Sequence, residues 1–125
     1  MYRGYQAKQC RICHEELNQK QDLFHLVNES AICIKCIKKF QIIDEDVKIK
    51  GYSVKILYEY NDFFRQLLYQ YKALGDYALK DCFIEQFQEL KRLYKNYIIV
   101  VIPSSQKDNE RRGFCPNVEI AKILD

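Results

Sequence analysis

Residues 10–36 read CRICHEELNQKQDLFHLVNESAICIKC and hold two Cys-x-x-Cys pairs, Cys10 with Cys13 and Cys33 with Cys36. Nineteen residues separate the pairs, which is a spacing typical of zinc ribbons. Two thiolates on a tight turn can bind one ion, and the second pair completes a tetrahedron around Zn²⁺ with Zn–S distances of about 2.3 Å. The sequence therefore predicts one structural zinc ion. A site closed by four thiolates leaves no open coordination position, so it stabilises a small module and performs no chemistry.

Two other interpretations of the cysteine pairs explain less. In the first, the pairs form reactive or merely structural dithiols. In the second, Cys10, Cys13 and His14 attach a c-type haem, but that motif belongs to exported proteins and leaves the second pair unexplained. With four thiolates available, His14 and His25 are expected at the surface or beside the ligands rather than among them.

The composition is that of a folded protein. Hydrophobic residues make up 48% and charged residues 30% of the chain, which excludes a disordered one. The net charge of +3 is too small to indicate nucleic-acid binding by itself. The first eight residues lack the apolar stretch of a signal peptide, and no window approaches the roughly 20 apolar residues of a membrane span. We therefore expect a cytoplasmic protein, in which paired thiols bind metal rather than form disulfides.

Two further cysteines have no partner at ligand spacing. Cys82 lies in a predicted helix, between polar and apolar positions, and is expected in the core or at its flank. Cys115 lies in a predicted loop, where a reactive thiol and an ordinary one both stay open and the ordinary one is favoured.

The first half of the chain favours strands. A short apolar run at 23–27 suits one strand of a zinc-ribbon hairpin, and the acidic residues 44–46 suit a linker. Residues 47–60 are rich in Val, Ile and Tyr and have Gly51 in the middle, which predicts a strand pair.

Two helices are predicted next. Asn61 and Asp62 suit a helix cap, because short polar side chains accept from the first free backbone amides. Apolar residues then recur at helical spacing until Gly75 and Asp76, which end that helix and begin another. The apolar face of the second helix holds Leu79, Phe83, Phe87, Leu90 and Tyr94.

The last third predicts the edge of a larger sheet. Residues 97–102 form a continuous apolar run, which suits a buried parallel strand. Residues 104–112 are polar and suit a loop, and 114–124 suit the start of a last helix. This order belongs to α/β folds, or to α+β folds if the sheet is small. Because a parallel sheet needs further strands and none follows before Asp125, the domain is expected to be incomplete.

The predicted loop contains groups that suit a phosphate. Ser104 and Ser105 follow the predicted strand, and Arg111 and Arg112 lie a few residues later. Ligands of α/β sheets bind just beyond the carboxyl ends of strands, where amides, hydroxyls and guanidinium groups can hold phosphate or pyrophosphate. The alternative is a solvated loop with an ordinary charge cluster, which the pattern alone favours.

Three motifs resemble those of the ComF family of competence proteins. They are YKALGDY at 71–77, IPSS at 102–105 and RGF at 112–114. In that family a cysteine-rich zinc module precedes a type I phosphoribosyltransferase-like domain, and the motifs follow in this order and spacing. The resemblance covers nearly the whole chain. It implies a zinc-ribbon module with four cysteine ligands at 1–46 and the front part of the phosphoribosyltransferase-like domain at 47–125.

The resemblance also implies a ligand site and no catalytic residue. Ser104 and Ser105 lie where the family would hold pyrophosphate oxygens. Lys72 would mark the basic lip of the site, and a solvated lysine at a helix end fits that position equally. Arg111 and Arg112 would belong to the flexible loop that folds over phosphoribosyl diphosphate, and Gly113 is expected to bind phosphate with them.

Departures from the family pattern argue against transferase activity. Asp108 stands where the family has an arginine, which turns an anion contact into repulsion. Cys115 and Pro116 replace Asn-Gln, and proline removes a backbone donor. The loop that binds the ribose phosphate, an acidic pair followed by Thr-Thr-Gly, does not occur before Asp125. This chain alone is therefore not expected to be an active transferase.

The resemblance implies a competence protein of DNA uptake that binds single-stranded DNA, a DNA-translocating helicase, or both. One alternative is a phosphoribosyltransferase completed by residues absent here, which would bind phosphoribosyl diphosphate. The other is a free-standing zinc-ribbon module that binds nucleic acid or protein. In the simpler interpretation, the basic residues of this module form only a solvated surface. The contacts of the module would come from Lys35, Lys38, Lys39, Phe40, Lys48, Lys50, Tyr52 and Lys55.

Overall fold

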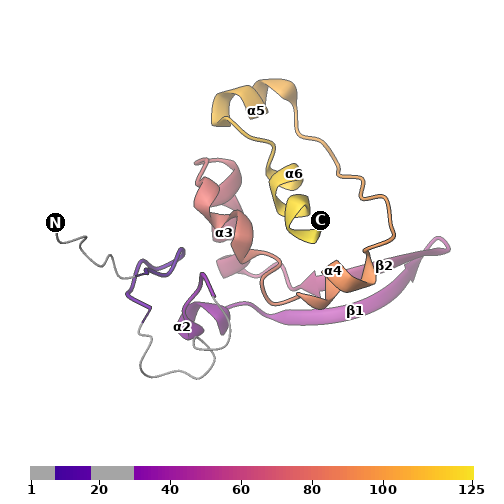
Figure 1. Ribbon diagram of the computed structural model, residues 1–125, viewed down its shortest axis with the longest axis horizontal. Coiled ribbons are helices and arrows are strands. Elements are labelled where there is room, and N and C mark those ends of the chain that lie inside the picture. The colour runs from indigo at the N-terminus through magenta and orange to yellow at the C-terminus, as the bar shows by residue number, and fades with distance from the viewer. Residues whose placement is uncertain (1–7, 18–29) are drawn as a thin grey trace.

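The computed structural model in Figure 1 describes residues 8–17 and 30–125. One antiparallel hairpin lies at the bottom of this view, and most of the short helices lie above it. The fold is α+β, the form expected for a small sheet, with a four-cysteine cluster near the N-terminus. Among the helices of the described ranges, none has the length and apolar character that a membrane crossing requires.

The hairpin is the predicted strand pair. β1 (Ile42–Ile49) pairs with β2 (Tyr52–Tyr58) through a two-residue turn, Lys50 and Gly51. The backbone φ angles at the turn are 48° for Lys50 and 85° for Gly51. Two positive values are the signature of a type I′ turn, whose twist matches that of a hairpin and which favours glycine at its second position. This turn fixes the register in which Ile49 faces Tyr52.

The prediction of a linker at 44–46 is wrong, because these acidic residues lie in β1. Lys55 on β2 lies between two of them, with its Nζ 2.8 Å from Asp44 Oδ1 and 3.6 Å from Asp46 Oδ2. Asp46 and Lys55 are also register partners. Opposite charges at facing positions stabilise a strand pair, so the acidic run contributes to the sheet.

The first predicted helix is confirmed as α3 (Asp62–Lys72). The Asn61 side chain accepts a hydrogen bond from the backbone N–H of Phe64 at 2.8 Å and so satisfies a free donor at the helix start. At the other end, the Tyr71 hydroxyl is buried and donates to the carbonyl of Pro116 at 2.8 Å. This bond joins α3 to the C-terminal part of the chain.

The prediction of one long second helix is wrong, because the chain forms two short pieces. η1 (Tyr77–Cys82) is a 3-10 helix and α4 (Glu89–Leu93) is an α-helix. At their junction Cys82, Phe83 and Ile84 are all buried. Three consecutive buried residues do not fit the single apolar stripe of a surface helix, and the backbone between the two pieces is irregular. Most of the predicted apolar face is nonetheless buried, namely Leu79, Phe83, Phe87 and Leu90.

The prediction of a buried parallel strand at 97–102 is also wrong. The segment runs from α4 towards α5 as an extended link (Figure 1), and the exposed fraction reaches 93% for Ile98, 86% for Val100 and 81% for Ile102. A β-branched run is buried only when neighbouring strands cover it. The one sheet formed by the described residues is the β1–β2 hairpin, and it does not include this segment.

The prediction of a loop at 104–112 is wrong because α5 (Gln106–Arg112) occupies most of it. The Ser105 hydroxyl caps the helix by accepting from the Asp108 N–H at 3.2 Å, and Gly113 ends it in the left-handed conformation with φ of 84°. None of the seven residues of α5, all of them described, is buried, so no apolar period marks the helix in the sequence. The predicted last helix is confirmed as α6 (Pro116–Ala121) and η2 (Lys122–Leu124).

One hydrophobic core includes both the cysteine turns and the later helices. Phe40 lies where the two parts meet and is 6% exposed. Its ring centroid lies 5.1 Å from that of Tyr58, 5.0 Å from Phe63 and 6.2 Å from Phe64. The division into residues 1–46 and 47–125 stays a prediction. The buried members of the core are Cys10, Ile32, Cys36, Phe40, Leu67, Tyr71, Leu79, Cys82, Phe83, Ile84, Phe87 and Leu90.

Candidate metal centre

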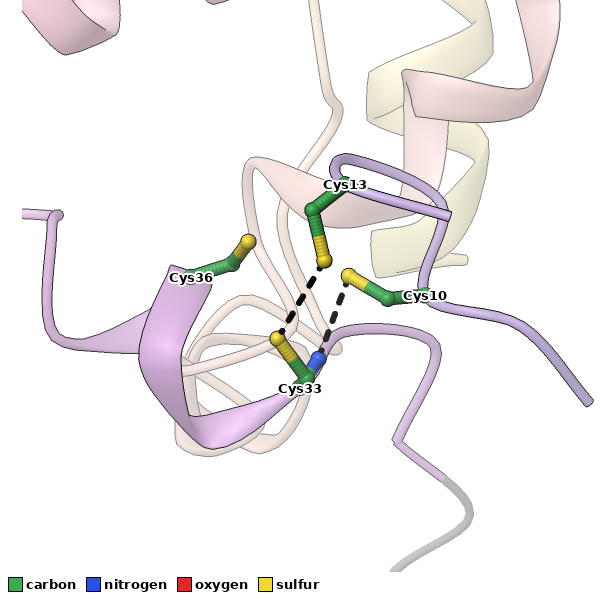
Figure 2. A group of neighbouring side chains, drawn as sticks. All are labelled: Cys10, Cys13, Cys33 and Cys36. Carbon is green, nitrogen blue, oxygen red and sulfur yellow. Dashed lines mark hydrogen bonds between the residues drawn. The ribbon is translucent and has the colours of Figure 1, made fainter. Parts of the chain in front are cut away.

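Each cysteine pair lies on a short turn, and the two turns point their sulfur atoms towards one another (Figure 2). In the first turn, the backbone N–H of His14 donates to the Cys10 carbonyl at 2.8 Å. In the second, Cys33 is the N-cap of α2 (Ile34–Ile37), which carries Cys36. These local hydrogen bonds hold both ligands of a pair on the same side of its turn.

The four sulfur atoms have the spacing of a metal–thiolate centre. All of them lie within 4.8 Å of one another, and the Sγ atoms of Cys13 and Cys33 are 3.6 Å apart. The corners of a tetrahedron with Zn–S bonds of about 2.3 Å lie about 3.8 Å apart, whereas a disulfide brings its sulfurs to about 2.05 Å. All four thiols are free. The donor set and its geometry therefore fit one tetrahedral metal ion.

The pKa values of the Cys10 and Cys36 thiols shift in opposite directions. Burial raises the pKa of Cys10, but bonds to the backbone of Cys13, Cys33 and Ile12 outweigh it and bring the pKa to about 7. One of these bonds is donated by the Cys33 N–H to Cys10 Sγ at 3.3 Å. Burial also raises the pKa of Cys36, and the neighbouring sulfurs raise it further. Thiolates packed this closely repel one another, and a divalent cation among them would remove that repulsion.

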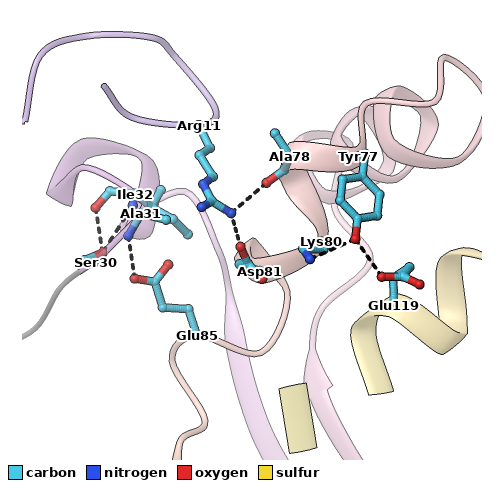
Figure 3. A network of polar contacts seen from close by, with 10 residues as sticks. All are labelled: Arg11, Ser30, Ala31, Ile32, Tyr77, Ala78, Lys80, Asp81, Glu85 and Glu119. Atoms are coloured by element: carbon cyan, nitrogen blue, oxygen red, sulfur yellow. Dashed lines mark hydrogen bonds and ion pairs between the residues drawn. The ribbon is translucent and has the colours of Figure 1, made fainter. Parts of the chain in front are cut away.

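Contacts with residues far along the chain anchor both turns (Figure 3). Arg11, between the first two cysteines, donates to the Ala78 carbonyl at 3.1 Å and forms an ion pair with Asp81 of η1. Next to the second turn, the Ala31 N–H donates to Glu85 Oε1 at 2.9 Å. These partners are 54 to 70 residues apart in the sequence, which is why no local pattern predicted them. The one available signal was an arginine placed inside a Cys-x-x-Cys pair.

Replacing Arg11 by alanine is expected to lower the free energy of unfolding by about 0.5–1.5 kcal/mol, because a partly exposed ion pair and a hydrogen bond to Ala78 are both lost. Urea unfolding of the metal-loaded protein measures the change. Arg65→Ala is the matched control, since it removes a more exposed pair with Asp62 on the surface of α3. An Arg11 variant no less stable than the Arg65 variant would contradict the anchoring role.

Among the described residues, the other cysteines and the one histidine lie outside the cluster. His14 is exposed and is not one of the four clustered residues. His25 and the strand predicted at 23–27 lie outside the described residues. Cys82 is a core residue, as predicted, and burial raises its pKa to about 12. Cys115 is half-buried and precedes α6.

The residues predicted to bind phosphate lie on and around α5. Arg112 Nε donates to the Lys72 carbonyl at 2.9 Å, so the structure brings these two predicted residues together. The Ser105 hydroxyl donates to an Asp108 carboxylate oxygen at 2.7 Å, and Arg111 lies 3.5 Å from the same carboxylate. The Ser105 hydrogen bond first, and the nearby arginines second, lower the pKa of Asp108. Phosphate binding stays a prediction for these residues and for the flanking Ser104 and Gly113.

Fold and cysteine cluster together define a small α+β protein with a centre able to hold one metal ion. No protein-family model matches the chain, and no solved structure matches it. Competence protein ComFC of Bacillus subtilis (strain 168) is 30% identical to it over 99 residues, which cover 76% of this chain. The chain belongs to the ComF family, as its ordered motifs predict. It spans 40% of the length of this relative.

Proposed function

We propose that this chain takes part in DNA uptake during competence, in the cytoplasm, by binding single-stranded DNA. The observation that carries the proposal is the similarity to competence protein ComFC over 76% of the chain. The three motifs at 71–77, 102–105 and 112–114, in their order behind two cysteine pairs, support it. A DNA-translocating helicase that works beside the chain is the proposed protein partner.

Zinc is the ion that we propose for the four-cysteine cluster. A tetrahedral set of four thiolates favours Zn²⁺ over ions that prefer oxygen ligands. Cys10 is 0% exposed and Cys36 is 1% exposed, so the ion would lie against the hydrophobic core. With every coordination position filled by protein, its role would be to stabilise the module that carries the two turns.

The eight basic and aromatic residues suggested for nucleic-acid contacts are only partly available. Phe40 is buried in the core, and Lys55 is held by Asp44 and Asp46. Lys35 lies 3.4 Å from Glu15, which offsets its charge. Three of the eight are exposed around the β1–β2 turn, and we call them the hairpin tip: Lys48, Lys50 and Tyr52.

Titration of a labelled oligothymidine with the zinc-loaded chain tests the proposed function. Binding is expected to weaken as salt rises, because each phosphate contact releases counterions from the strand. If the chain contacts three phosphates of the strand, the slope of log K against log salt would be about −2. The affinity would then fall roughly 20-fold between about 50 and about 200 mM salt.

A duplex of the same length is the control, and it should bind more weakly, since its bases are not free to stack on protein aromatics. Affinity for the single strand that is indifferent to salt, or no binding at low salt, would contradict the proposal. Retention of this chain by a competence helicase on a column would test the partner separately.

A further inference from the structure

A cavity of about 530 Å³ lies between α4, the segment that follows it, and the C-terminal residues. Its volume is within the range of sites that hold small molecules or single nucleotide units. The lining combines basic and aromatic side chains, and we call it the basic–tyrosine cavity. The residues that matter for the argument are Lys91, Arg92, Tyr94, Lys95, Tyr97 and Ile99.

The lining of this cavity carries three basic side chains that are exposed to solvent. Lys91, Arg92 and Lys95 are all exposed, and within residues 8–17 and 30–125 none of them forms an ion pair. Asp125 is the one acidic residue of the lining. Three basic residues against one acidic residue favour an anionic ligand.

The aromatic part of the cavity is positioned for stacking. Tyr94 and Tyr97 meet edge to face, with ring centroids 5.5 Å apart and an interplanar angle of 80°. Tyr97 is 68% exposed, so most of its ring is in contact with solvent. An exposed tyrosine beside unpaired cations matches the two needs of a nucleotide, a flat surface for the base and positive charge for the phosphate.

We infer that the basic–tyrosine cavity binds one nucleotide unit of a single strand of nucleic acid. The base stacks on Tyr97 while Lys91 and Lys95 contact the phosphate, with Arg92 adding charge. The hairpin tip also has an exposed tyrosine and two exposed lysines, but three acidic residues of β1, Asp44, Glu45 and Asp46, lie close to it in the sequence and oppose an anionic ligand. The inference rests on the proposed function, because it locates the strand that the proposed function requires.

The test uses the full zinc-loaded chain and a labelled oligothymidine of about 12 nucleotides, within the usual site sizes of single-strand binding proteins. Tyr97→Ala should weaken binding roughly 5- to 100-fold and leave the salt slope unchanged, because stacking involves no counterions. Tyr97→Phe should bind like the wild type, since it keeps the ring. The double variant Lys91→Ala, Lys95→Ala should reduce the salt slope by about 1.4.

A matched double variant, Lys48→Ala with Lys50→Ala, removes the same charge from the hairpin tip, the competing candidate for strand contacts, and should reduce the affinity and the salt slope less than the cavity variant does. All substituted side chains are exposed, and thermal unfolding confirms that each variant folds. A wild-type chain that binds the strand while the cavity variants bind equally well overturns this inference and leaves the proposed function intact. A wild-type chain that binds no strand overturns both. Free thymidine monophosphate competing as well as the strand would overturn the assignment to a strand.

Discussion

If the four-cysteine cluster binds one zinc ion per chain, as proposed, Cys36→Ser is expected to reduce the zinc content by at least about tenfold. A serine hydroxyl does not replace a thiolate as a zinc ligand, and a tetrahedral site that loses one of four ligands loses most of its affinity. Because metal binding supplies folding free energy, on the order of 10–16 kcal/mol in zinc-finger peptides, the region around the two cysteine turns is expected to unfold as well. Native mass spectrometry measures the first effect and amide hydrogen exchange the second.

Cys115→Ser provides the matched control for this variant. Cys115 is half-buried, lies outside the four-cysteine cluster and precedes α6, far along the chain from both turns. The control should keep one zinc ion and normal hydrogen exchange. If the Cys36 variant also kept a full zinc ion, the ligand set would be wrong. Removal of the metal by a chelator should reproduce the Cys36→Ser exchange pattern in the wild-type protein.

Local chemistry explains why the cysteine cluster and the hairpin could be predicted from the sequence. A Cys-x-x-Cys pair is a chelate whose geometry depends on four residues, and the second pair needs only to meet the first. The hairpin was equally local, since Gly51 at the second turn position and β-branched residues on either side specify it. The capped start of α3 at Asn61 followed the same logic.

Long-range contacts explain most of what could not be predicted. Arg11 with Asp81, and Ala31 with Glu85, join segments whose sequences carry no shared pattern. The run at 97–102 has the composition of a buried strand, but composition reports what a segment can pack against and not whether a neighbouring strand is present. Its exposure in the described part of the chain therefore could not be read from its residues.

The helix α5 was missed for a different reason, since its signals are local and were present. Ser105 and Asp108 stand at the N-cap and third helical position, and Gly113 stands just past the end. These positions make a start and a stop signal of the usual kind. Because α5 buries none of its residues, its sequence has no apolar period. The prediction of a loop relied on this missing period rather than on the cap residues.

Phe40→Ala is expected to lower the free energy of unfolding by about 3–5 kcal/mol, the usual cost of removing a buried aromatic ring. Phe40 is 6% exposed, and three rings lie within 6.2 Å of its centroid, so the neighbours cannot collapse fully into the space. Domains of this size have a total stability of about 5–15 kcal/mol, so the loss would be a large fraction. Urea unfolding of the zinc-loaded protein measures it.

The shape of that unfolding curve tests whether the chain is one folding unit. Phe40 follows the second cysteine pair by four residues and packs on rings from β2 and α3, so it links the cysteine turns to the rest of the core. If the parts fold together, Phe40→Ala will shift a single transition and will also speed zinc release to a chelator. Tyr60→Ala, which removes a ring that is 65% exposed, should do neither. Two separate transitions, with only one shifted by Phe40→Ala, would instead support two independent folding units on either side of residue 46. In that case Phe40 would stabilise one unit and not the other.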